Sequence, residues 1–243
     1  MNPDFFEPPV SRRTALKSAI ALAGAATLAQ QTAQAAESGH ARAPRRYHMR
    51  RSINLWAFPY PDKMTLRQCL QLAKDAGFDG IELNYDLESD LSPKAGTKEF
   101  QEIRKMADSI GIQISGLCSF LFWPYPLTSN DPEKRAHGLE LAAKMTQAAH
   151  DLSTENLLVV PGAVHIPWRT DHEPVRNDIC EQRAKEAIGK LLPAAERLKV
   201  HMNMENIFFN GFLMTPMEMN AFVDSFNSEF VHVHFDTGNI MQY

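Results

Sequence analysis

The segment VHVHFDTGN, residues 231–239, alternates apolar side chains with two histidines and then an aspartate, Asp236. Because successive side chains of a strand point to opposite faces, the histidines and Asp236 share one face and the apolar residues share the other. Residues 201–206, HMNMEN, repeat this pattern, with Glu205 on the polar face. A doubly wound open sheet has helices on both faces and near-continuous apolar strands. One polar and one apolar face indicates instead a barrel with a polar lumen.

Strand-like and helix-like segments alternate along the rest of the chain, and no hairpin pattern interrupts them. Capping boxes at Thr65 and Thr215 open two of the helices, and Asp131 followed by proline opens a third. The predicted strands are 53–58, 79–84, 112–120, 156–164, 201–205 and 231–236, and the predicted helices are 65–77, 97–110, 131–152, 178–198 and 215–226. This order predicts an α/β fold with a parallel sheet, a TIM-type (β/α)8 barrel of which the chain carries about six βα units.

A barrel of eight strands that is built from only six would leave two unpaired sheet edges. We therefore expect residues 52–243 to be an incomplete barrel from a longer protein that continues beyond the C-terminus. The roughly 190 residues of this region are enough for one large domain.

The amino-terminal segment has the features of an export signal. Arg12 and Arg13 precede an alanine-rich apolar run, and residues 33–35, AQA, have the small-x-small form of a cleavage site. The segment is similar to a twin-arginine signal, so we expect residues 1–36 to be a signal peptide and residues 37–51 a flexible basic linker. The mature protein is then expected in the periplasm or outside the cell. An amphipathic first helix is the alternative, and the run is too short to span a membrane as a helix.

The composition argues against a nucleic-acid partner. The chain has 25 Lys and Arg against 29 Asp and Glu, a formal net charge of −4, and no concentrated basic face is visible. Its three cysteines allow at most one disulfide and have no zinc-finger spacing. The chain is therefore expected to depend on its core for stability and to act on a small molecule, with a homo-oligomer possible.

A pair of carboxylates is the main chemical feature of the sequence. Motifs of serine hydrolases, zincins, P-loop proteins and Rossmann folds are absent. Glu205 and Asp236 each end a predicted strand, and the carboxyl ends of parallel strands meet at one end of a barrel. Carboxylates bind hard or borderline cations, so one divalent metal ion is predicted, Mn²⁺, Mg²⁺, Co²⁺ or Zn²⁺. Buried ion pairs are the alternative explanation of these acids.

Three segments together resemble the xylose isomerase-like TIM-barrel superfamily of sugar isomerases and epimerases. They are GFDGIEL at 77–83, MENIFFNGFLMTP at 204–216 and FDTGN at 235–239, and the last two are similar to segments of L-ribulose-5-phosphate 3-epimerase-like and hexulose-phosphate isomerase-like proteins. The resemblance implies that Glu205 is a metal ligand and a catalytic acid/base, and that Asp236 is a second metal ligand. It also implies that the remaining His and Glu ligands come from two later strands. The chain by itself is therefore expected to be inactive.

The reaction that the resemblance implies is proton abstraction next to a ketose carbonyl, through an enediolate that the metal ion stabilises. A carboxylate on the opposite face of the substrate would give an epimerase, whereas proton return to the adjacent carbon would give an isomerase. Export favours an unphosphorylated keto sugar. The alternatives are a lyase or dehydratase acting on an inositol-like or 3-keto sugar, and a noncatalytic sugar-binding barrel. Endonuclease IV-like DNA repair shares the barrel, but the chain lacks a basic groove.

Several polar and aromatic residues near the predicted strand ends are candidates for contact with a sugar. His232 and His234 alternate like ligands, but they lie deeper in the lumen and are expected to be hydrogen-bonded histidines, either in the core or behind the metal ligands. Helix or loop capping and simple packing are the alternatives for the other candidates. The predicted substrate-binding residues are Glu82, Trp56, Trp123, Asn206, His165 and Asn239.

Overall fold

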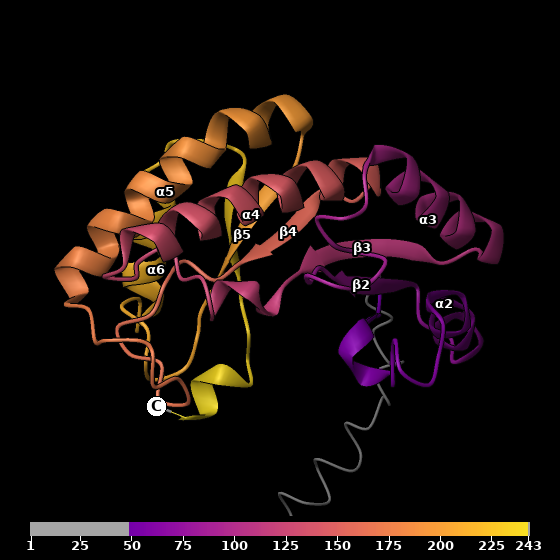
Figure 1. The fold of residues 1–243 in the computed structure, drawn as a ribbon, viewed down its shortest axis with the longest axis horizontal. Helices are drawn as coiled ribbons and strands as arrows, with labels where there is room; N and C mark the ends of the chain where they lie inside the picture. The colour runs from indigo at the N-terminus through magenta and orange to yellow at the C-terminus, as the bar shows by residue number, and fades with distance from the viewer. Residues whose placement is uncertain (1–48, 243) are drawn as a thin grey trace, which may run out of the picture. The chain divides into compact units, whose positions relative to one another are not determined.

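Six strands pair in parallel, each with its neighbours in sequence order, to form one sheet (Figure 1). The strands are β1 (Ser52–Asn54), β2 (Gly80–Asn84), β3 (Gln113–Cys118), β4 (Asn156–Val159), β5 (His201–Glu205) and β6 (Val231–His234). The structure, a computed structural model, describes residues 49–242. The predicted signal peptide and most of the predicted linker lie outside the described residues. Residues 50–243 form one unit, and the features below belong to it.

One α-helix connects each successive pair of strands from β1 to β6. A short 3₁₀ helix precedes the α-helix after β1 and after β3. The α-helices are α2 (Leu66–Asp75), α3 (Thr97–Ile110), α4 (Pro132–Asp151), α5 (Asn177–Leu198) and α6 (Pro216–Asp224). The short 3₁₀ helices are η1 (Leu55–Ala57), η2 (Phe120–Phe122) and η3 (Asn239–Gln242). This is the predicted order of βα units, with a parallel sheet.

Local capping interactions set the helix ends where the sequence predicts them. The hydroxyl of Thr65 accepts from the amide of Gln68, whose side chain accepts from the Thr65 amide, so both halves of the capping box are formed. Helix α3 ends at Gly111, which has a left-handed φ of 78° that costs a glycine little. Asp131 accepts from the amides of Glu133 and Lys134 at the start of α4.

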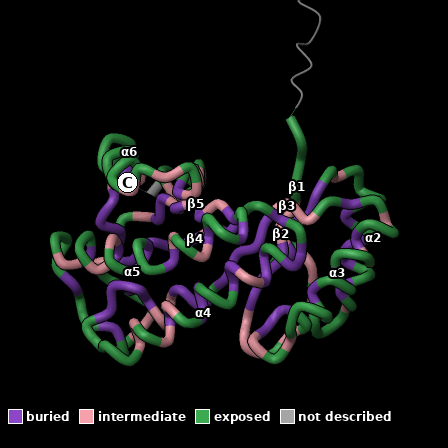
Figure 2. The backbone as a smooth tube through the Cα atoms, turned by 90° about the horizontal axis from the view of Figure 1, so that it is seen from above, coloured by how far each residue is buried: buried purple, intermediate pink, exposed green. Residues whose placement is uncertain are grey.

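The two faces of the strands have the expected polarity in most of the sheet. Met202 and Met204 of β5 are fully buried, as are Ile81 and Leu83 of β2. Helices α3, α4 and α5 follow one another along one side of the sheet in Figure 1, and their chains alternate between buried and exposed stretches in Figure 2. The core therefore lies between this helical layer and the apolar strand face. Among residues 49–242, no helix is long and apolar enough to cross a membrane.

Every predicted strand except 201–205 is longer than the strand in the structure, and β1, β3, β4 and β6 end earlier than predicted. β1 stops at Asn54, whose side chain accepts from the Trp56 amide, and β3 stops before Ser119, whose hydroxyl accepts from the Leu121 amide. Such short polar side chains offer the backbone an alternative to the strand ladder, and a 3₁₀ turn follows each of them. β4 also ends early, at Val159.

The apolar face of β6 departs from the expected pattern. Val231 is buried, but Val233 is 38% exposed and Phe235 is 60% exposed. The apolar face that the sequence predicts for this strand is therefore not covered at its last two residues. β6 pairs with β5 alone, so its other edge and the end of its apolar face have no strand beside them among the described residues.

Candidate active site

A pocket of about 540 Å³ opens at the carboxyl ends of the strands. Active sites of α/β barrels form at this end, from the loops that follow the strands. A cavity of about 580 Å³ lies at the opposite end, beside the amino ends of β3 and β4, but it contains neither Glu205 nor Asp236. We therefore take the first pocket as the candidate site. The predicted residues that line it are Trp56, Glu82, Trp123, Glu205, Asp236 and Asn239.

The two predicted metal ligands lie next to each other on adjacent strands. Glu205 is the last residue of β5 and pairs in register with His234, two residues before Asp236. Burial is the main cause that raises the pKa of Glu205 from its ordinary 4.5 to about 7, and the negative charges of Asp236 and Glu82 add to it. A hydrogen bond between Glu205 and Asp236 acts in the same direction. The pocket therefore holds a carboxylate whose negative charge is poorly compensated by the protein.

A set of hydrogen bonds to the backbone holds Asp236 in place. Its Oδ1 accepts from the amides of Gly238 at 2.7 Å and Asn239 at 3.1 Å. The amide side chain of Asn206 donates to the Asp236 carbonyl at 2.8 Å and accepts from the Asp236 amide at 2.7 Å. Asn239 in turn donates to the Asn206 carbonyl at 2.9 Å. Asn206 was predicted to contact substrate, but it is buried outside the pocket lining and positions the loop that carries Asp236.

The third acid, Glu82, is held by a neighbouring strand. Its Oε2 accepts from Nδ2 of Asn54 at 2.6 Å. Gly116 on β3 leaves room for it, because a Cβ atom at this position would lie 3.2 Å from Oε1 of Glu82. Burial, with the charges of Glu82 and Glu205, raises the pKa of the nearby Cys118 thiol well above its ordinary value. A thiol that stays protonated is a poor nucleophile, so this environment favours a structural role for Cys118.

Aromatic side chains from three different loops form one wall of the pocket. Trp123 stacks on Phe208 with ring centroids 5.8 Å apart, and Trp168 meets Trp123 edge-on at 5.0 Å. Trp56 also lines the pocket and is 60% exposed. Phe208 was not among the predicted residues, although its place three residues after Glu205 was a signal that could have found it. His165 is exposed and does not line the pocket.

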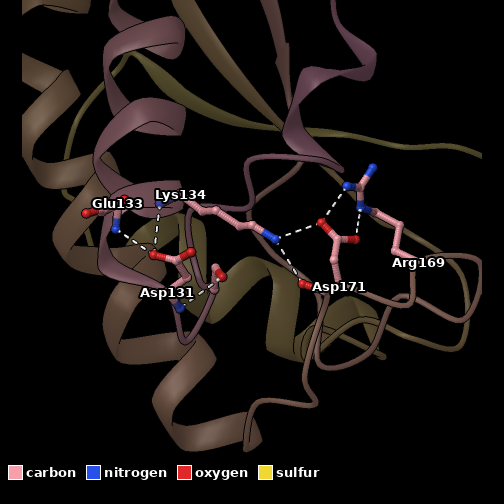
Figure 3. A network of polar contacts seen from close by, with 6 residues as sticks. Asp131, Glu133, Lys134, Arg169 and Asp171 are labelled. Carbon is pink, nitrogen blue, oxygen red and sulfur yellow. Dashed lines mark hydrogen bonds and ion pairs between the residues drawn. The ribbon is translucent and has the colours of Figure 1, made fainter.

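The loop that carries Trp168 is tied to the start of α4 by charged groups (Figure 3). Lys134 donates to the Asp171 carboxylate at 2.7 Å and to the Asp171 carbonyl at 2.9 Å. Arg169 donates to both oxygens of the same carboxylate, from Nε at 2.9 Å and from Nη2 at 2.7 Å. These partners lower the pKa of Asp171, with the Arg169 hydrogen bonds as the largest cause. The network holds the loop close to the aromatic wall.

Residues 70–243 match a family model described as the xylose isomerase-like TIM barrel. The chain belongs to this family. The six-stranded parallel sheet agrees with part of such a barrel, and the fold predicted from the sequence is confirmed.

This xylose isomerase-like chain is similar to several proteins that are named as sugar epimerases. L-ribulose-5-phosphate 3-epimerase UlaE of Escherichia coli O1:K1 is 24% identical over 173 residues, which are 70% of this chain and 58% of that protein. The chain thus spans less than two thirds of the length of this relative. D-psicose 3-epimerase from Clostridium cellulolyticum H10 superposes with a TM-score of 0.67 at 18% identity, over 79% of this chain and 65% of that one.

A second similar structure has a different sugar in its name. The 3-keto-D-glucoside 4-epimerase YcjR of E. coli superposes with a TM-score of 0.61 at 15% identity, over 77% of this chain and 68% of that one. At these identities the structural likeness establishes the xylose isomerase-like fold, and the activity follows from the site only by further argument.

The donor set of this xylose isomerase-like site suits a divalent cation. Within residues 49–242, no group of three or more His, Cys, Asp or Glu side chains surrounds a common metal position. Glu205 and Asp236 nevertheless offer hard oxygen donors side by side, and the raised pKa of Glu205 reports negative charge that a cation would offset. His234 lines the same pocket. The described residues therefore fit a metal ion as part of its coordination shell.

Proposed function

We propose that this protein is a divalent-metal-dependent sugar epimerase or isomerase in which Glu205 transfers a proton at the carbon next to a ketose carbonyl. The observation that supports this most is the place of Glu205, a carboxylate that lines one pocket with Asp236 and Glu82 and whose pKa is raised to about 7 when no cation is bound. A xylose isomerase-like fold and sugar epimerase relatives agree with the proposal.

Each acid has a distinct role in this proposal. Glu205 removes or returns a proton on one face of the substrate, and an enediolate forms between the two transfers. Return of the proton by Glu205 to the adjacent carbon gives an isomerase, whereas an epimerase needs a second acid on the opposite face of the substrate. Asp236, fixed by Asn206 and by two backbone amides, holds the ion together with Glu205. A bound Mn²⁺, Mg²⁺, Co²⁺ or Zn²⁺ ion supplies positive charge that favours the oxyanion. Glu82 keeps its orientation through Asn54 and is placed to accept from a substrate hydroxyl.

An unphosphorylated keto sugar suits the pocket better than a sugar phosphate. Three carboxylates line it, and its described lining residues include no lysine or arginine. A phosphate dianion would therefore be repelled by the pocket unless other groups compensate. The wall of Trp56, Trp123 and Phe208 offers apolar contact to the carbon-bound hydrogens of a sugar. We expect a higher kcat/KM for a free ketose than for its phosphate ester.

Solvent-exchange experiments test the proposed reaction. Protein expressed from its complete gene is incubated with Mn²⁺ and a panel of free ketoses in D₂O, and deuterium in the sugars is located by NMR. Deuterium at carbon 3 identifies an epimerase and deuterium at carbon 1 an isomerase. Glu205→Gln should abolish exchange, whereas Glu155→Gln, an exposed glutamate outside the pocket, should retain it.

Other outcomes of the same experiment distinguish the alternatives. Loss of water from an inositol-like or 3-keto sugar indicates a lyase or dehydratase that begins with the same proton abstraction. Sugar binding with no exchange at any carbon, in protein that binds Mn²⁺, contradicts the catalytic proposal and indicates a noncatalytic barrel.

We also propose that the protein is exported by the twin-arginine pathway and acts in the periplasm or outside the cell. The support is the pair Arg12 and Arg13 before a short apolar run. Changing both to lysine keeps the charge but removes the arginine pair, and it should leave the protein in the cytoplasm in a fractionation assay. Export of this double variant at the normal level would contradict the proposal.

A further inference from the structure

Two histidine rings converge on one carbonyl oxygen at the amino ends of β5 and β6. Nδ1 of His201 and Nε2 of His232 lie 3.1 Å apart. Both nitrogens approach the carbonyl oxygen of Glu229, at 2.9 and 2.7 Å respectively. Three atoms that can bind a metal thus form a compact triangle, although they come from two strands and from the turn before β6.

We propose that His201, His232 and the Glu229 carbonyl form a binding site for a transition-metal ion of the Cu²⁺, Ni²⁺ or Zn²⁺ class. Imidazole nitrogen suits these metals, whereas hard ions such as Mg²⁺ prefer oxygen ligands. With metal–ligand bonds of about 2.0 Å, two ligand atoms are roughly 2.8 Å apart at the 90° angles of a square-planar site and roughly 3.3 Å apart in a tetrahedral site. The three separations of 2.7, 2.9 and 3.1 Å lie closer to the square-planar values that Cu²⁺ and Ni²⁺ prefer. Water would complete the coordination shell.

The two rings can exchange their hydrogen bonds for metal bonds by a change of tautomer. The Glu229 carbonyl oxygen can only accept, so in the metal-free protein the ring nitrogens that contact it donate to it. A metal ion binds a ring nitrogen that lacks its proton, so metal binding would move the proton to Nε2 of His201 and to Nδ1 of His232.

The surroundings favour a cation and hold one of the rings. His201 stacks on Phe230 with ring centroids 5.0 Å apart and an interplanar angle of 17°, which limits rotation of the ring. His232 lines a groove of about 480 Å³ together with Asp224 and Glu229, whose carboxylates give the groove a negative charge. A positively charged group, the ammonium of Lys199, lies over the other ring of this stack, 5.2 Å from the centroid of Phe230.

This site is separate from the acids of the candidate active site. His201 begins β5 and Glu205 ends it. At about 3.3 Å per residue, the two positions are roughly 13 Å apart along the strand. The proposal is therefore independent of the sugar epimerase proposal, and a metal ion here would tie β5, β6 and the turn before β6 together.

Copper binding tests the site in a background that lacks the other donors. The Glu205→Gln/Asp236→Asn protein, stripped of metal with EDTA and dialysed, is titrated with Cu²⁺ and studied by EPR spectroscopy. We expect one bound Cu²⁺ per chain whose spectrum shows coupling to two imidazole nitrogens. A large excess of Mg²⁺ should not displace it. His201→Gln and His232→Gln should each leave one coupled nitrogen and weaken binding by at least about tenfold.

The matched control is His137→Gln, which removes a surface histidine of α4 and should change neither the spectrum nor the affinity. The fold of each variant is checked by circular dichroism. A protein with both histidines replaced by glutamine can be added, and the two single variants suffice for the test if that protein does not fold. The proposal is overturned if the background protein is folded but binds no Cu²⁺. It is also overturned if both single variants keep the two-nitrogen spectrum, because the nitrogens would then belong to other side chains.

Discussion

Replacing Glu205 with glutamine should stabilise the metal-free protein at alkaline pH. The pKa of this carboxyl is raised from 4.5 to about 7, so between these pH values the folded protein holds more protons than the unfolded chain. Stability therefore falls as the pH rises through this interval. A pKa increase of this size corresponds to about 3 kcal/mol of unfolding free energy. Glutamine cannot ionise, so residue 205 no longer contributes to the fall in stability with rising pH.

The expected gain depends on pH in a defined direction. Because Glu205 is partly exposed and solvent screens its neighbours, we expect Glu205→Gln to be about 1–3 kcal/mol more stable than the wild type near pH 8.5. Near pH 5 the wild-type carboxyl is largely protonated in the folded state, so the difference should be small. Urea unfolding in EDTA, followed by tryptophan fluorescence, measures both values.

A matched variant and a metal titration complete this test. Glu155→Gln removes an exposed glutamate before β4 and should shift stability by less than about 0.5 kcal/mol at both pH values. Added Mn²⁺ should raise the urea midpoint of the wild type but not that of Glu205→Gln. If Glu205→Gln is less stable than the wild type near pH 8.5, the residues around Glu205 do not destabilise its charged carboxylate in the wild type. The electrostatic argument for a cation at this position then fails.

Two further predictions concern the packing around the site. Asn206→Ala removes both side-chain hydrogen bonds to the Asp236 backbone, at a stability cost of about 1–3 kcal/mol. It should also weaken Mn²⁺ binding, measured by calorimetry, about 10- to 100-fold. An unchanged Mn²⁺ affinity would refute the positioning role of Asn206. Gly138→Ala should destabilise the fold by more than about 2 kcal/mol in urea, because its Cβ would lie 2.2 Å from the carbonyl oxygen of Tyr125. Gly189→Ala in α5 meets nothing within 4 Å and should instead gain about 0.5–1 kcal/mol, so equal effects of the two alanines would contradict this account.

Helix boundaries could be predicted from the sequence because they depend on neighbouring residues. The capping residues Thr65, Asp131 and Thr215, and the left-handed Gly111, act within one or two turns of their own helix. Their interactions follow from side-chain chemistry at a fixed spacing, and the structure confirms each of them. Strand ends were predicted less well, because hydrogen bonding by Asn54 and Ser119 competes there with pairing to a distant strand.

The candidate site could be predicted only in part. The period of two along β5 placed Glu205 on the polar face, and the structure brings it beside Asp236 and Glu82 in one pocket. The same reasoning could not tell that Asn206 points away from the pocket to hold the Asp236 backbone, since this depends on how two loops meet. It also missed Phe208, which joins the pocket wall by stacking on Trp123, a residue far away in the sequence.

The parallel βα order, the polarity of most strand faces and the two acids at the strand ends could all be predicted from the amino-acid pattern. These features follow from periodicity and local chemistry, which need no knowledge of distant contacts. The raised pKa of Glu205 depends on the three-dimensional fold, because burial and the charges of Asp236 and Glu82 act through space. The fold alone also brought His201 and His232 together on one carbonyl oxygen, since strand pairing sets which residues of β5 and β6 meet.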